Sequence, residues 1–141
     1  MASVQSVLMD SLSLIIDESL TIAMEDEGIE DGILGSNYIQ TNNGSEWRTV
    51  CSGLFSVRIS ENLRMLTIVD EHTSTNRVLR TISIPDFSTQ DTVNIHKWFV
   101  KKYNFISNMI MELYHNRHAT QSTIDKVIAK VIKEQSHNYF L

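Results

Sequence analysis

The chain has little of what fixes a fold covalently or holds a protein in a membrane. Cys51 is its one cysteine among 141 residues, so no internal disulfide can form, which is typical of a reducing interior. The apolar patch at residues 12–16 is broken by polar residues, and no basic segment precedes it. We therefore expect neither a signal peptide nor a membrane span, and we predict an intracellular, cytoplasmic protein.

Basic residues are missing from the first third of the chain. Residues 1–47 hold nine acidic residues and no lysine or arginine, whereas residues 48–141 hold all twelve basic residues and eight acidic ones. The net charge of the whole chain is −5. This asymmetry is typical of an acidic arm on a body that handles an anionic partner, and equally of an ordinary solvated acidic segment.

Motifs for catalysis and metal binding are absent or incomplete. There is no glycine-rich phosphate loop and no G-x-S-x-G motif, and residues 25–35 lack the alternating oxygen ligands of a calcium loop. Glu112, His115 and His118 are spaced like half of a binuclear metal site, which needs acids from several helices. Cys51 is expected on the apolar side of a strand, where a thiol is inert. We predict no enzyme activity, no catalytic residues, no metal and no cofactor.

What is present is a helix–strand pattern typical of one α+β domain over residues 1–141. Residues 3–24 have apolar residues at helical spacing, and Ser3 can cap this helix. Residues 25–35, rich in acids and glycine, predict a hinge, so that residues 1–35 form an acidic helical arm. The apolar side of this helix either packs on the domain's own core or docks a partner protein.

Residues 36–84 predict a four-stranded antiparallel meander sheet. Asn43-Gly44 is the sharpest turn signal, because type I′ turns need two residues at positive φ. Strands are expected over residues 38–41, 47–60, 63–69 and 77–84, and short connections favour pairing of sequential neighbours. Pro85, the only proline, ends the last strand.

Two helices complete the predicted fold. A long amphipathic helix over residues 92–114 completes a ββββα core at residues 36–115, and a C-terminal helix follows over residues 120–136. The apolar stripe of the long helix covers the sheet. Its flanks are apolar enough to leave a surface for a second subunit, so we expect a homodimer.

The polar side of the sheet is the surface with the strongest ligand-binding character. Arginines supply phosphate contacts, and an exposed tyrosine can stack on an unpaired base. Lysines of the long helix can extend the rim of this surface. We predict nucleic-acid contacts from Arg48, Arg58, Arg64, Arg77, Tyr38, Lys97, Lys101 and Lys102. Arginines on an exposed sheet face are also common without any ligand.

The order of four strands over residues 36–84 and one long helix over residues 92–114 resembles the ββββα unit of the Whirly and positive-cofactor-four type of proteins. In that group the unit dimerises, and extended single-stranded nucleic acid lies across the sheet face away from the helices. The resemblance implies a non-enzymatic homodimer that binds single-stranded RNA or DNA. The acidic arm and the C-terminal helix depart from the family pattern.

The alternative function is a protein-interaction or assembly module that docks a partner through residues 3–24. The composition, rich in Asn, Ser, Ile and Met, is compatible with a phage or viral origin, for which the location becomes the host cytoplasm.

Overall fold

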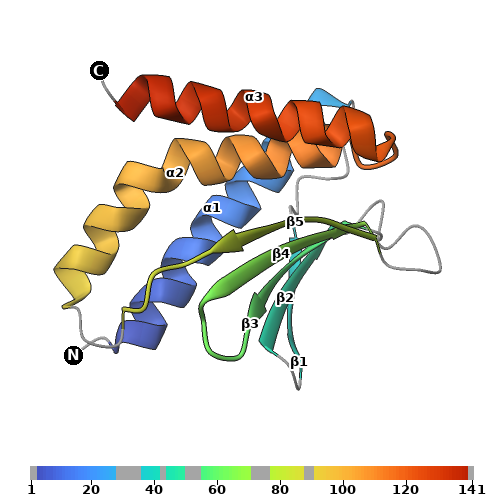
Figure 1. Ribbon diagram of the computed structural model, residues 1–141. Helices are drawn as coiled ribbons and strands as arrows, with labels where there is room; N and C mark the ends of the chain where they lie inside the picture. Colours follow the sequence, from blue (N-terminus) through green and yellow to red (C-terminus); the bar gives the residue numbers. More distant parts are fainter. Residues whose placement is uncertain are drawn as a thin grey trace.

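The computed structural model describes residues 3–27, 36–41, 44–49, 55–70, 77–87 and 91–139, and it has an α+β fold (Figure 1). Helix α1 (Val4–Asp26) precedes an antiparallel sheet, and helices α2 (Thr92–His115) and α3 (Gln121–Tyr139) follow it. The three helices lie on one side of the sheet, with α3 above the edge strand in the view of Figure 1. The predicted α+β class, with one helix before an antiparallel sheet and two helices after it, is confirmed.

The sheet is a meander in which each strand pairs with its neighbour in sequence. The described strands are β1 (Ser36–Thr41), β2 (Gly44–Thr49), β3 (Phe55–Ser60), β4 (Met65–Asp70) and β5 (Arg77–Ser83), arranged spatially in that order. The prediction of one strand over residues 47–60 is wrong, because β2 and β3 are antiparallel neighbours with Trp47 opposite Val57. The sheet therefore has five described strands rather than four.

The chain reversal between β2 and β3 could not be recognised from the alternation of apolar and polar residues. Trp47 in β2 and Phe55, Val57 and Ile59 in β3 are all odd-numbered and all buried in the same core. The hydrophobic phase is therefore continuous through the reversal, and a phase argument cannot detect it. Residues 50–54, which join β2 to β3, lie outside the described residues.

A shift in strand register explains why Arg80 is in phase with the apolar residues of its strand. β4 pairs with β5 so that Ile68 lies opposite Arg80, but Val69 lies opposite Val78, and Leu79 is the extra residue of a bulge. Leu79 is buried, whereas Arg80 is exposed at the sheet edge. The bulge thus moves a leucine into the core and leaves the arginine in solvent.

Helix α1 is part of the core and is tied to the sheet. Its N-terminus is capped as predicted, since the Ser3 hydroxyl accepts from the Ser6 N–H at 3.1 Å. The Trp47 indole N–H donates to Ser13 Oγ at 3.3 Å, which joins β2 to α1. The buried apolar residues of α1 are Leu8, Leu12, Ile15, Ile16, Leu20, Ala23 and Met24.

Helices α1 and α2 lie side by side and run in the same direction (Figure 1). The hydroxyls of Ser19 and Ser107 are hydrogen-bonded at 2.8 Å and buried between the helices. One turn away, the Tyr103 hydroxyl donates to the Glu18 carboxylate. Small serines let the two backbones approach closely, and the hydroxyl pair satisfies both polar groups in the buried interface.

The Tyr103–Glu18 contact predicts a loss of stability in alkali. The hydrogen bond to the Glu18 carboxylate, together with desolvation and the adjacent negative charge, raises the pKa of Tyr103 to about 12. An unfolded tyrosine ionises near pH 10, so the contribution is fully present below about pH 10 and is lost as the pH rises to about 12. The urea midpoint should be higher for the native chain than for Tyr103→Phe at neutral pH, and this difference should shrink above about pH 10. A pH-independent difference would contradict this assignment.

Candidate ligand-binding groove

The predicted arginine surface is not assembled on one face of the sheet. Arg58 lies on the face away from the helices, where its Nε donates to Glu46 Oε1 at 3.2 Å. Glu46 is only 4% exposed, and Ser56 and Val69 on the same face are buried as well. The centre of this face is therefore closed to solvent, and Arg58 neutralises a carboxylate of its own sheet.

Two further arginines lie elsewhere. Arg64 belongs to the connection between β3 and β4 and is ion-paired with Asp86. Arg77, at the start of β5, donates from Nη2 to the Ala119 carbonyl at 2.8 Å, in the connection between α2 and α3. Arg77 thus reaches the helical layer, so Arg58, Arg64 and Arg77 point to three different parts of the molecule.

For Tyr38 and Arg48 the structure describes only the backbone. Tyr38 pairs with Trp47, and Arg48 pairs with Asn37. The two predicted residues therefore belong to adjacent residue pairs of the β1–β2 ladder. Their side chains lie outside the described part of the structure.

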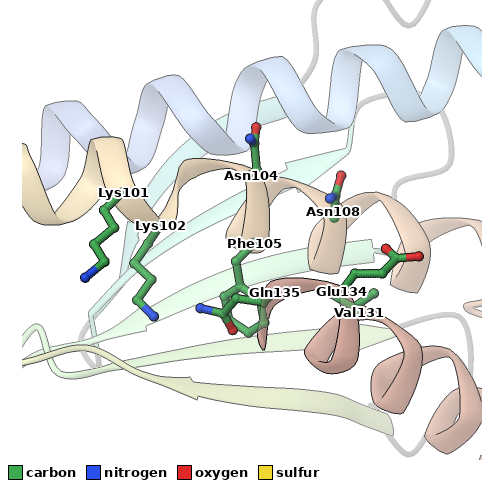
Figure 2. A pocket seen from close by; sticks show the side chains of 8 residues that line it. All are labelled: Lys101, Lys102, Asn104, Phe105, Asn108, Val131, Glu134 and Gln135. Atoms are coloured by element: carbon green, nitrogen blue, oxygen red, sulfur yellow. The ribbon is translucent and has the colours of Figure 1, made fainter. Parts of the chain in front are cut away.

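The lysines of α2, by contrast, come together at a concave site. Lys101 and Lys102 line a groove of about 440 Å³ between α2 and α3, which we call the α2–α3 groove (Figure 2). Its lining residues are Lys101, Lys102, Asn104, Phe105, Asn108, Val131, Glu134 and Gln135. Lys97 is exposed one turn earlier on α2 and is not among them.

A second hollow of about 330 Å³ adjoins this groove beneath the edge of the sheet. It shares Lys102 and Phe105 with the α2–α3 groove, so the two hollows are neighbours along α2. Its walls are mostly apolar, and its lining residues are Ile82, Ser83, Ile84, Pro85, Trp98, Lys102, Phe105 and Ile106. The combined site therefore has a cationic part, the α2–α3 groove, and an apolar part, the adjoining hollow.

The α2–α3 groove combines a cation, an aromatic ring and amides. Lys102 Nζ lies 5.9 Å from the centroid of the half-buried Phe105 ring, within the range of a cation–π contact. Figure 2 shows Lys101, Lys102 and Phe105 extending on the same side of α2, with Gln135 of α3 close to the ring. Glu134 contributes the one acidic side chain of the lining. This set can hold an anionic group beside a flat apolar one.

Of the three residues that resemble half of a metal site, His115 lies against the end of α1. His115 lies 3.7 Å from Asp26 and 3.4 Å from Glu27, at the end of α1. Arg117 Nη1 donates to Glu27 Oε1 at 3.1 Å. Burial by itself would raise the pKa of Glu27, but the hydrogen bonds and charges of Arg117 and His115 lower it below the ordinary value. Among the described residues no group of three or more His, Cys, Asp or Glu side chains could hold a metal ion.

Sequence reasoning found the lysines but missed the rest of the site. Phe105 and Gln135 were not singled out, because neither belongs to a motif and their proximity depends on how α3 packs on α2. Phe105 could have been predicted only from its spacing to Lys101 and Lys102, because this spacing places the three residues on neighbouring turns of one helix.

Comparisons with protein-family models, curated proteins and solved structures gave no match to this chain. The Whirly-type resemblance thus stays a prediction from the sequence. In the described part of the chain, none of the helices combines the length and apolar character that crossing a bilayer requires.

Proposed function

We propose that this protein is a non-enzymatic, single-stranded nucleic-acid-binding protein that holds RNA or DNA in the α2–α3 groove. The observation that carries the proposal is the placement of Lys101 and Lys102 beside the half-buried Phe105 in one concave site. The proposal keeps the ligand expected from the sequence and moves the contact surface from the sheet to the helices.

The chemistry of a single strand supports this site. Single-stranded nucleic acid offers phosphates and unstacked bases, and proteins bind it by combining cationic grooves with aromatic side chains. Lys101 and Lys102 supply the positive charge, and Phe105 supplies a ring on which a base can stack. The carboxamides of Asn108 and Gln135 can donate to and accept from base edges. A volume of about 440 Å³ lies within the range of small-molecule sites.

Binding of a labelled single-stranded oligonucleotide, followed by fluorescence anisotropy over a range of salt concentrations, tests the proposal. Lys102→Ala should weaken binding about tenfold, the value of one charge-assisted contact. It should also reduce the slope of log affinity against log salt by about 0.7, because one fewer counterion is released. Phe105→Ala should cost about 1–3 kcal/mol and leave that slope unchanged, since stacking releases no counterions.

Matched variants separate the groove from general charge effects. Glu134→Gln should strengthen binding about twofold to fivefold, because it removes a negative charge from the mouth of the groove. Lys126→Ala removes the same charge as Lys102→Ala from the exposed side of α3, outside the lining, and should leave affinity unchanged. Absence of binding at low salt would refute the function. If Arg58→Ala were the only substitution that weakened oligonucleotide binding, the binding site would lie on the sheet and not in the groove.

The protein-docking alternative needs a different surface from the one expected. The apolar stripe of residues 3–24, through which we expected a partner to dock, is buried against the sheet and α2. A partner could reach it only if the domain opened. The homodimer expected from the sequence likewise needs a surface other than this stripe.

A further inference from the structure

Helices α1 and α2 expose a set of large apolar residues on their outer side. Leu14 is 57% exposed and Ile22 is 45% exposed on α1, while Val93 is 59% and Val100 is 65% exposed on α2. The other apolar positions of these helices face the core. Four of the described exposed large hydrophobic residues therefore belong to this one pair of adjacent helices, a concentration that marks an interaction surface.

The contacts between the two helices fix which residues lie at the same level. Glu18 is bonded to Tyr103, and Ser19 to Ser107, which are 85 and 88 positions apart. Because the helices run in parallel, a residue of α1 lies level with the α2 residue about 86 positions later. Leu14 is thus level with Val100. We call the exposed apolar side chains of these two adjacent helices, Leu14, Ile22, Val93 and Val100, the α1–α2 face.

The charges around the α1–α2 face are of opposite sign on its two halves. The α1 helix carries five acidic residues and no lysine or arginine. The α2 helix carries three lysines and a single acid, Glu112. Lys101 and Lys102 line the α2–α3 groove, so Lys97 is the lysine of α2 that can serve this face. At the start of the face, Asp10 of α1 and Lys97 of α2 are both exposed and nearly level with each other. The face therefore combines the acidic residues of α1 with Lys97 of α2, next to the exposed apolar side chains of both helices.

A surface with this charge pattern is complementary to itself. A twofold axis parallel to the helices places α1 of each copy against α2 of the other, so that acidic residues of α1 meet Lys97 and apolar residues meet apolar residues. An axis across the helices would instead stack acidic α1 on acidic α1. Isologous interfaces require self-complementarity, and like charges brought together are strongly unfavourable, so only the first arrangement is favourable.

We propose that the α1–α2 face binds a second copy of this chain, with α1 packed against α2 of the partner and all four helices parallel. Rotation about this axis does not shift residues along the helices, so residues at the same height meet across the interface. Leu14 of one copy therefore meets Val100 of the partner subunit. The inference goes beyond nucleic-acid binding and does not rest on it. A monomer that binds oligonucleotide would refute the dimer alone, and a dimer that binds none would refute the proposed function alone.

The oligomeric state of the full chain, measured by sedimentation equilibrium, tests the inference. The native chain should be a dimer at micromolar concentration, and Val100→Glu should weaken dimerisation at least about tenfold, because it places a carboxylate against acidic α1. Val78→Glu is the matched control, since Val78 is 54% exposed on β5, away from the α1–α2 face. It should stay dimeric. A native monomer at high micromolar concentration, or equal effects of the two variants, would overturn the proposal.

Disulfide trapping tests the parallel arrangement. Leu14→Cys and Val100→Cys are made separately in a Cys51→Ser background, mixed, and oxidised, so that a mixed disulfide can form only between two copies. The mixed species should exceed both symmetric species. Predominance of either symmetric disulfide would overturn the proposed geometry, and far-UV circular dichroism confirms that each variant is folded.

Discussion

Deletion of residues 1–27 should leave a chain that does not fold. Helix α1 is a structural part of the core, in which six of its larger apolar side chains are buried together with those of the sheet and α2. Burial of such side chains contributes about 1.5–3 kcal/mol each, so the loss for six of them is about 9–18 kcal/mol. A domain of this size has only about 5–15 kcal/mol of net stability.

Circular dichroism and two-dimensional NMR of the truncated chain measure this outcome. We expect no cooperative thermal transition and poorly dispersed amide signals. A truncated chain that lacks only residues 136–141 serves as the control and should keep both. A cooperative, well-dispersed chain without residues 1–27 would contradict the core assignment, and it would restore residues 3–24 as a detachable segment for a protein partner.

Trp47→Ala should destabilise the fold more than any of the surface substitutions in the groove or on the α1–α2 face. The indole is 1% exposed and lies where β2 meets α1, and it donates to Ser13 Oγ. Replacing a buried tryptophan by alanine removes its transfer free energy and leaves a cavity, at a cost of about 3–5 kcal/mol. Urea unfolding followed by the fluorescence of Trp98, the other tryptophan, gives the free energy of unfolding.

Ser13→Ala separates packing from hydrogen bonding at the same place. It removes the acceptor of the indole N–H and keeps the ring, so it should cost no more than about 1–2 kcal/mol. If Ser13→Ala matched Trp47→Ala, the hydrogen bond rather than the packing would dominate the contact. If neither substitution changed the free energy of unfolding, the proposed contact between α1 and the sheet at Trp47 would be contradicted.

The helices could be predicted from the sequence because their periodicity reflects the same burial that forms them. The helix predicted over residues 92–114 is observed as Thr92–His115, and that over residues 3–24 as Val4–Asp26. The sheet was harder. A reversal that preserves the alternation of Trp47 and Phe55 leaves no trace in the pattern, and a bulge that shifts register at Ile68 and Val69 cannot be read from one strand alone.

The candidate site could be predicted only in part, because side-chain direction depends on the bulge and on neighbouring elements. Arg77 was assigned to a shared polar face, but it lies opposite Asp70 and bonds to the connection between α2 and α3. Lys101 and Lys102 were identified by charge alone. Their partner Phe105 became apparent only when α3 was seen to form the other wall of the groove.

The pairing of Ser19 with Ser107 has a consequence for how the protein is made. These residues are 88 positions apart, so a ribosome that adds roughly 5–20 residues per second needs about 4–18 s after emitting α1 before α2 can join it. During that interval α1 lacks α2 as a packing partner, and the side chains that α2 later covers are open to chaperones or to other nascent chains. Correct assembly in the cell therefore depends on keeping α1 from aggregating until α2 has been made.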